Sequence, residues 1–240
     1  MPQRARVLIA IDGPAGAGKS TVARKVAEEL GFVLVDTGAM YRVVALAASR
    51  KGYAFSDDEP VAALAERLAN ERSIRLEQDP SPDSTGVRVF LDGEDVSRAI
   101  RTPEMSLGAS RVSAIPRVRE ALLAMQRQAG EGGGVVLEGR DIGTVVFPDA
   151  EVKFYLTATS TERATRRHSE LSAKGQQVSL EDTLADVEKR DRADTLRPVA
   201  PLKQADDAIL VDSSGLPIDQ VVAQMVAVVR EREREYAKRR

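Results

Sequence analysis

Five short apolar runs rich in branched side chains recur along the chain, and each is bounded by Gly, Asp or Pro. Runs of this kind are typical of buried parallel strands. We predict strands at residues 7–11, 32–35, 135–138, 152–156 and 208–211. The segments between them space apolar residues as helices do, at 19–30, 39–51, 116–129, 161–174, 180–190 and 218–234. Strands that alternate with helices predict a doubly wound α/β fold with a parallel sheet.

Two segments break this alternation. Residues 73–97 alternate apolar and polar positions around PSPDSTG, which predicts an inserted β-hairpin. Residues 158–198 are charged, rich in arginine and poor in strand signals, although they lie between two predicted core strands. Large polar insertions in a compact domain are usually functional flaps or lids, and we expect that role here.

A glycine-rich loop directly follows the first predicted strand. It fits the pattern G-x-x-x-x-G-K-[ST] at Gly13, Gly18, Lys19 and Ser20. Small residues let successive N–H groups curl around phosphates, and the start of the next helix adds its dipole. Lys19 would reach the β- and γ-phosphates, and Ser20 would meet Mg²⁺. The predicted nucleoside triphosphate site comprises Gly13, Pro14, Ala15, Gly16, Ala17, Gly18, Lys19, Ser20 and Thr21.

Composition narrows the functional classes. The 240 residues carry a formal net charge of −2, so no overall field draws the chain to nucleic acid or an anionic membrane. Cysteine is absent, which excludes disulfides and thiolate metal sites. No leader or membrane span is evident, and we expect a soluble cytoplasmic protein. The single asparagine, Asn70, is followed by Glu71, so a guanine-reading N-K-x-D is missing and a small-molecule kinase fits better than a GTPase switch.

Charged residues also gather where strands are predicted to end. Asp36 closes the second strand and Arg42 follows it, while Arg140 and Asp141 follow the third strand. Open α/β sheets bind ligands at this edge. Arginines on helices are usually solvated or paired with a neighbouring acid, but Arg42 and Arg140 lie within a few residues of the edge. They therefore predict a second anion site.

Five segments in this order resemble the bacterial cytidylate kinases of the nucleoside monophosphate kinase group, over nearly the whole length. They are GPAGAGKST, DTGAMYRVVALAA, ASRVSAIPRVREALL, GRDIGTVVFPDA and RDRADTLRPVAPL. The resemblance implies a P-loop kinase core with a five-stranded parallel sheet flanked by helices, a monophosphate-binding insertion with the hairpin, and a helical lid. We assign the core to residues 1–57, 101–157 and 199–240, the insertion to 58–100 and the lid to 158–198.

The resemblance also implies roles for individual residues. The acceptor phosphate and nucleotide pocket would comprise Thr37, Tyr41, Arg42 and Arg140, which Arg197 would join on closure. The positions that match the cytosine-reading residues are Ser110, Arg119 and Asp141, and those around the pentose are Arg190 and Asp194. The catalytic residues would be Lys19 with the lid arginines Arg163 and Arg167. Ser20 would hold Mg²⁺, with Asp36 a candidate through a water. Glu138 stands where the family often has Asp, and both acids carry the same charge.

The implied reaction transfers phosphate from ATP to CMP or dCMP. Its nucleophile is a phosphate oxygen that is already anionic at neutral pH, so no general base is needed. The single histidine, His168, is therefore expected to be a structural residue of the lid. Asp141 can accept from the cytosine amine, whereas uracil would present a carbonyl and leave a buried acceptor unpaired. We accordingly expect CMP and dCMP to be preferred over UMP.

Two alternatives remain open at this stage. One is a P-loop kinase for another small acceptor, such as UMP or a shikimate-like hydroxyl substrate with Asp36 as base. The other is a nucleotide-binding regulatory or RNA-binding protein, although aromatic residues make up only 4% and no basic stripe is interleaved with them. We expect a monomer that binds neither nucleic acid nor membrane.

Overall fold

The computed structural model describes residues 4–79, 81, 85–173 and 175–238. Its main sheet has five parallel strands in the order β2-β6-β1-β7-β8. The strands are β1 (Leu8–Asp12), β2 (Val33–Asp36), β6 (Val135–Gly139), β7 (Val152–Thr157) and β8 (Ile209–Asp212). Every predicted strand is confirmed, with bounds shifted by about one residue, and the α/β class is confirmed with them.

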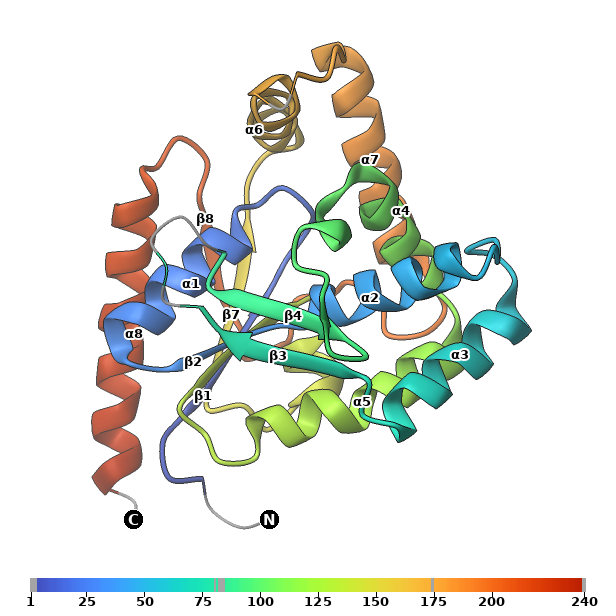
Figure 1. Cartoon of the computed structure of the whole chain (residues 1–240). Coiled ribbons are helices and arrows are strands. Elements are labelled where there is room, and N and C mark those ends of the chain that lie inside the picture. Colours follow the sequence, from blue (N-terminus) through green and yellow to red (C-terminus); the bar gives the residue numbers. More distant parts are fainter. Residues whose placement is uncertain (1–3, 80, 82–84, 174, 239–240) are drawn as a thin grey trace.

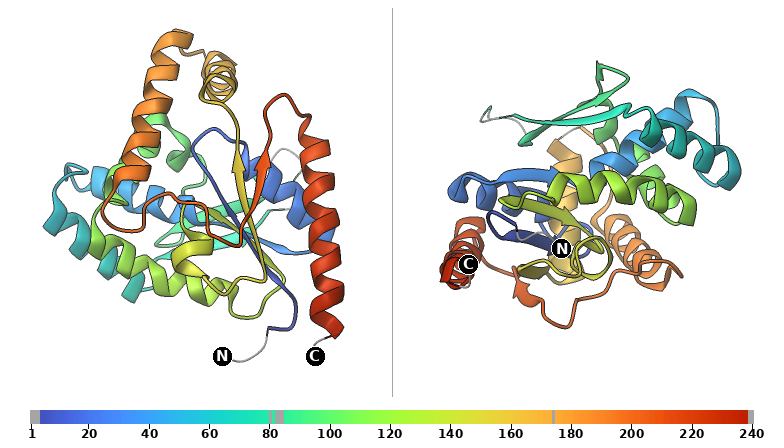
Figure 2. Two further views of the ribbon diagram at one scale, coloured as in Figure 1. Left: turned by 180° about the vertical axis from the view of Figure 1, so that it is seen from behind. Right: turned by 90° about the horizontal axis from the view of Figure 1, so that it is seen from below.

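Helices flank this sheet on both sides (Figures 1 and 2). They are α1 (Lys19–Leu30), α2 (Thr37–Arg50), α3 (Asp58–Asn70), α4 (Pro103–Val112), α5 (Pro116–Gly130), α6 (Ser160–Ala173), α7 (Leu180–Leu196) and α8 (Ile218–Lys238). Two short helical turns, η1 (Ala99–Arg101) and η2 (Ile142–Val146), complete the described part of the chain. The six predicted helices are confirmed, whereas α3 and α4 had not been predicted.

Several helix ends differ from the predicted ones for identifiable reasons. α2 begins at Thr37 rather than residue 39, because the Asp36 carboxylate caps it by accepting from the Ala39 N–H. α7 continues to Leu196 rather than 190, since no helix breaker precedes Pro198 and the backbone turns extended only at Arg197. α4 is capped by Thr102 and begins with Pro103, a combination that favours a helix start.

β1 lies at the centre of the sheet, and all five of its residues are buried. Its neighbours are also apolar and contribute large, fully buried side chains such as Phe154 and Leu137. The carboxyl ends of the strands consequently point to one edge, where the polar residues Asp12, Asp36 and Asp212 stand. Burial of the strands thus fixes where the polar residues meet.

The predicted hairpin is confirmed as an antiparallel pair, β3 (Ile74–Gln78) and β4 (Val87–Leu91), to which the two-residue strand β5 (Glu94–Asp95) adds. Part of its turn lies outside the described residues. The side-chain amide of Gln78 both accepts from and donates to the backbone of Leu34, so it occupies hydrogen-bonding groups of the edge strand β2. Preceding the hairpin, α3 packs against α5 and α2.

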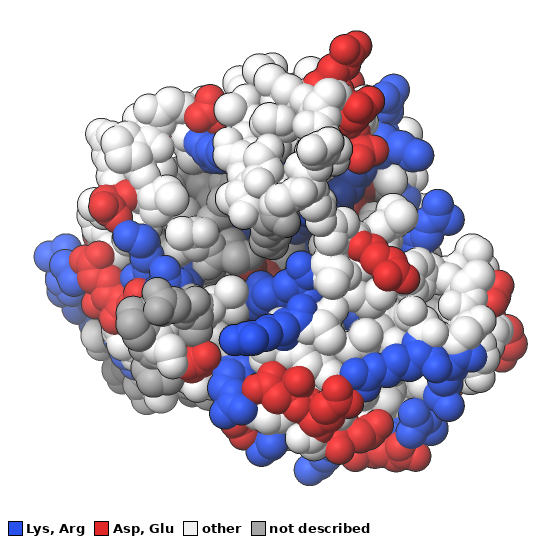
Figure 3. Space-filling view, turned by 45° about the horizontal axis from the view of Figure 1, so that its top comes forward, with Lys and Arg blue, Asp and Glu red and all other residues white. Residues whose placement is uncertain are grey.

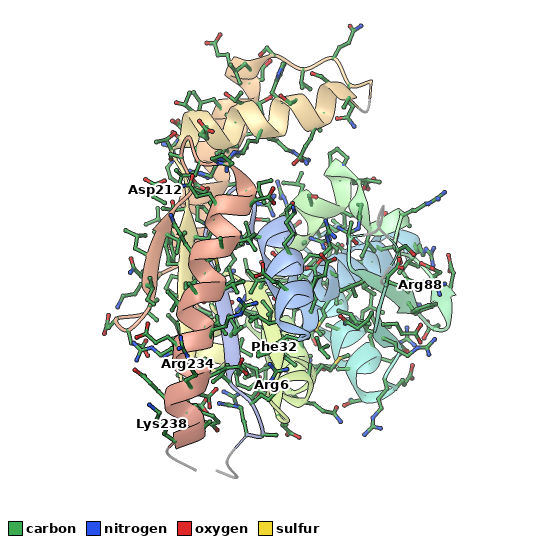
Figure 4. All side chains as sticks on the ribbon, turned by 90° about the vertical axis from the view of Figure 1, so that its left-hand side faces the viewer. Arg6, Phe32, Arg88, Asp212, Arg234 and Lys238 are labelled. Carbon is green, nitrogen blue, oxygen red and sulfur yellow. The ribbon has the colours of Figure 1, made fainter. Side chains whose placement is uncertain are left out.

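The predicted lid segment consists of α6 and α7, which pack against each other beyond the strand ends (Figure 1). On the far side from the hairpin, α8 packs against α1 (Figure 4). Near this helix the Arg6 guanidinium lies 4.0 Å from the centre of the Phe32 ring and pairs with Glu233. No helix within the described ranges is long and apolar enough to cross a membrane.

Candidate active site

The phosphate loop lies between the end of β1 and the start of α1. Gly13 is packed so closely against β7 that a Cβ there would fall 1.9 Å from the Leu156 carbonyl oxygen. Gly18 adopts a left-handed conformation, φ 86°, directly before the helix. Only glycine meets both requirements readily, which explains the two outer glycines of the motif.

Lys19 is buried at the first position of α1, and its Nζ donates to the Pro14 carbonyl oxygen at 2.7 Å. Burial lowers the pKa of this ammonium well below its usual value, and the nearby Arg140 and Arg190 lower it further. Glu138 and Asp194 act in the opposite direction but do not restore it. The charged form of Lys19 therefore needs an additional anion, and a nucleotide phosphate would supply one.

Ser20 is exposed beside the loop and lies next to the buried Glu138. Burial raises the pKa of Glu138, Asp36 adds to the rise, and Lys19 and Ser20 oppose it. No cluster of three or more acidic or histidine side chains that could hold a metal occurs among the described residues. A hydroxyl with a nearby carboxylate suits Mg²⁺ that keeps water and phosphate oxygens as its other ligands.

Asp36 and Arg42 form an ion pair at the start of α2, with 2.6 Å between Oδ2 and Nη2. Arg101, a residue that the sequence had not singled out, approaches the same carboxylate at 3.9 Å. Burial acts to raise the pKa of Asp36, but the two arginines and the Ala39 N–H outweigh it and the pKa falls. With both oxygens of Asp36 engaged, a water-mediated metal role for it stays a prediction with little support from these contacts.

Arg140 and the lid meet through Asp194, whose Oδ2 accepts from the Arg140 Nε at 2.9 Å. Arg190 lies one turn before Asp194 on α7, as the spacing had suggested. Its Nε is buried and has no hydrogen-bond partner within the described part of the chain. Burial lowers the pKa of Arg190 to about 10, and the cation Arg140 contributes most among its charged neighbours.

A second polar group surrounds Asp141. This carboxylate forms an ion pair with the buried Arg119, and its Oδ1 lies 3.6 Å from the Arg197 Nη2. The Arg119 guanidinium lies 5.6 Å from the centre of the Tyr41 ring. The predicted cytosine-reading residues Arg119 and Asp141 are thus in contact, beside two residues that were predicted to bind the rest of the acceptor.

The other predicted acceptor residues are less directly involved. Thr37 donates its hydroxyl to the Glu138 carbonyl oxygen at 2.7 Å, which ties α2 to β6. Ser110 lies partly buried on α4, and its carbonyl oxygen accepts from the Ser113 hydroxyl. Their contacts with a substrate stay predictions.

The two lid arginines differ from each other. Arg163 is 5% exposed, and its guanidinium donates to the carbonyl oxygens of Ala158 and Ala15 and to the Asp191 carboxylate. It therefore braces the phosphate loop against α7, and a direct catalytic role for it stays a prediction. Arg167 is exposed to solvent in part, pairs with Glu170 at 3.2 Å, and is close enough to lower the pKa of Arg190.

Basic side chains collect at the centre of the face that carries the strand ends (Figure 3). They come from α1, α2, η1 and α7 and from the residues that directly follow β6 and α7: Lys19, Arg42, Arg101, Arg140, Arg190 and Arg197. Their acidic counterparts are Asp36, Glu138, Asp141 and Asp194. Cations outnumber anions in this cluster, and a dianionic or polyanionic ligand would restore the balance.

The family model described as cytidylate kinase matches residues 9–231. The chain belongs to the cytidylate kinase family. It is 55% identical to a cytidylate kinase from Syntrophotalea carbinolica over 95% of this chain and 94% of that one. It is 51% identical to a cytidylate kinase from Geobacter sulfurreducens, with 96% of both chains covered.

Among solved structures, an uncharacterized protein from Eubacterium ventriosum aligns with a TM-score of 0.52 at 14% identity, covering 94% of this chain and 99% of that one. That likeness shows a shared fold alone. Membership of the family makes the chain a nucleoside monophosphate kinase, in agreement with the phosphate loop and the cationic cluster.

Three residues of the site escaped sequence reasoning. Arg101 is the last residue of the short helical turn η1, and no local pattern distinguishes it from a surface arginine. Asp191 is hidden in a run of alternating charges. Asp12 had a usable signal, because it ends a buried strand at the ligand edge, which is the rule that had identified Asp36.

Two substitutions in the lid should separate binding from stability. Arg190→Gln removes a poorly partnered cation among cations, so the free energy of unfolding should stay within about 1 kcal/mol of wild type, whereas tripolyphosphate affinity should fall at least about tenfold. Arg163→Gln breaks a partly buried ion pair and two carbonyl contacts, and should cost about 2 kcal/mol or more. Urea unfolding measures the free energy of unfolding, and titration calorimetry measures the affinity for tripolyphosphate. Equal destabilisation by the two variants would contradict this division of roles.

Proposed function

We propose that the protein transfers the γ-phosphate of ATP to CMP and dCMP, giving CDP and dCDP. The observation that carries the proposal is the surplus of buried and partly buried cations at the strand ends, above all the Arg190 Nε that lacks a hydrogen-bond partner within the described residues. Support also comes from the family and from the relatives that bear the name cytidylate kinase. Two phosphate-bearing substrates brought together would need such a surplus.

The acceptor phosphate binds between Arg42, Arg140 and Arg101, displacing the carboxylates that now face them. Asp36 and Asp194 hold two of these arginines in position between turnovers. One acceptor phosphate oxygen then attacks the γ-phosphorus in line, and the bond to the β-phosphate oxygen breaks. Because this oxygen is already charged, the protein supplies alignment and neutralisation rather than proton transfer.

Charge neutralisation on the donor side falls to Lys19 and the loop N–H groups. We reassign Arg190 from the acceptor's pentose to the donor phosphates, because its buried Nε lacks a hydrogen-bond partner among the described residues. Mg²⁺, held through the Ser20 hydroxyl and phosphate oxygens, would offset further phosphate charge when it is bound. Arg167 joins from the lid as α6 and α7 close. Closure of residues 158–198 and 58–100 over the core residues keeps out water, which would otherwise hydrolyse ATP.

Base recognition follows from the acid and the donors near Arg119. Asp141 accepts from the exocyclic amine of cytosine, while Arg119 and Ser110 donate to ring N3 and O2. Uracil has a carbonyl where cytosine has its amine. The Asp141 carboxylate would then be a buried acceptor without a donor, at a cost of roughly 1–3 kcal/mol in binding free energy. The preference for CMP over UMP rests on Asp141, Arg119 and Ser110.

We further propose that the protein acts in the cytoplasm as a monomer.

A coupled assay with CMP, dCMP, UMP, AMP and shikimate tests the function. CMP and dCMP should be phosphorylated with the highest kcat/KM, and Lys19→Met should abolish turnover while the protein stays folded, because its charge stabilises the transition state. Highest activity on UMP or shikimate would establish the alternative kinases. If the protein bound RNA and transferred phosphate to none of these acceptors, its assignment as a kinase would be contradicted.

Asp194→Ala tests ribose recognition. If Asp194 accepts from the 2′-hydroxyl, the KM for CMP should rise much more than that for dCMP, changing the ratio of kcat/KM by at least about tenfold. The same variant also frees Arg140 from its ion pair, and that part of the effect should be equal for both substrates. Steady-state kinetics on both nucleotides distinguishes the two contributions. Equal losses on CMP and dCMP would remove the ribose assignment and leave Asp194 as a partner of Arg140 alone.

A further inference from the structure

Asp12 is the last residue of β1 and is almost completely buried. Its carboxylate accepts two backbone hydrogen bonds from a different element: Oδ1 from the Ile142 N–H at 2.8 Å and Oδ2 from the Gly143 N–H at 2.7 Å. Burial raises the pKa of Asp12 to about 6, and Asp141 adds to the rise, against the two N–H groups and Lys19. Burying the Asp12 carboxylate near that of Asp141 is energetically unfavourable. The two backbone hydrogen bonds that Asp12 accepts therefore call for a functional explanation.

The segment that Asp12 holds is the wide turn that follows β6. Within it the N–H groups of Val145 and Val146 both donate to the Asp141 carbonyl oxygen, and the Phe147 N–H donates to that of Ile142 at 2.7 Å. The first N–H groups of a helical turn have no partner inside the turn. Asp12 supplies both acceptors from the neighbouring strand, so it caps the turn from outside the segment.

This cap lies directly next to the predicted base-reading residue. Asp12 is in register with Gly139, two residues before Asp141. The residues it grips are the two that follow Asp141. At Gly143 the fit is tight, since a Cβ would lie 3.1 Å from the Lys153 Cδ and 3.4 Å from the Asp12 Oδ2. The backbone of Asp141 is thus fixed from one side by Asp12, while its carboxylate is held on the other by Arg119.

We infer that Asp12 is a positioning residue for recognition of the acceptor base: it sets where the Asp141 carboxylate stands relative to Arg119 and thereby the discrimination of cytosine from uracil. The inference rests on the proposed function. Asp12 also precedes Gly13, the first residue of the phosphate loop, so one short stretch of chain anchors the donor loop and the base-reading turn. An error of about 1 Å at such a carboxylate is enough to weaken a hydrogen bond substantially.

Asp12→Asn gives the direct test. The amide keeps the shape but offers one acceptor and an NH₂ group, which would face one of the two backbone N–H groups as donor against donor. We expect the KM for CMP to rise at least about tenfold, the KM for ATP to stay within about twofold, and the ratio of kcat/KM for CMP over UMP to fall at least about fivefold. Asp207→Asn is the matched control, because its exposed carboxylate accepts from Lys153, which packs beside Gly143. It should leave all three quantities unchanged.

A second variant guards against a folding defect in Asp12→Asn. Gly143→Ala places a methyl group 3.1 Å from the Lys153 Cδ and in van der Waals contact with the Asp12 carboxylate, so it crowds the same turn and should reduce the preference for CMP in the same direction. Equal losses on CMP and UMP in both variants, or kinetics like those of wild type, would overturn the role of Asp12. Failure of the wild-type protein to phosphorylate CMP would instead contradict the proposed function, so the two results can be told apart.

Discussion

The structure depends on an electrostatic imbalance that the chain tolerates in its interior. Arg140 and Arg190 lower the pKa of the buried Lys19, Arg140 also lowers the pKa of Arg190, and the nearby carboxylates only partly offset these effects. Burying like charges is unfavourable unless something else compensates. Here the fold supplies that compensation through a fully buried central strand and two helical layers, and the remaining deficit becomes binding energy for phosphate.

Two arginines of the cluster face a carboxylate that a substrate phosphate can replace: Asp36 faces Arg42, and Asp194 faces Arg140. These pairs hold the arginine side chains in place, so little side-chain entropy remains to be lost on binding. Arg163 is a contrast within the same lid, since it satisfies two carbonyls and one carboxylate and joins the phosphate loop to α7. The arrangement separates residues that hold the site together from those that await a ligand.

The sequence allowed the sheet, most helices and the phosphate loop to be predicted, because each leaves a periodic or spaced pattern. The ends of α2 and α7 were misplaced, since the Asp36 cap and the absence of a breaker before Pro198 outweighed the apolar spacing. Arg101 and Asp191 could not have been found, because their importance lies in contacts between distant segments. Arg163 was predicted as a lid arginine, but its contacts were not predicted. From α6 its guanidinium donates to the Ala15 carbonyl oxygen of the phosphate loop.

Hydrogen exchange on α7 (Leu180–Leu196) and on strand β4 (Val87–Leu91) of the insertion, with and without a cytidine–adenosine pentaphosphate bisubstrate analogue, tests the central claim most directly. Completing the charge balance should draw the lid and the insertion onto the core, so exchange in both elements should slow only when both nucleotide sites are filled, and the protection should weaken as salt is raised. Unchanged exchange in both elements, or equal protection by adenosine alone, would contradict a cleft that phosphate charge completes.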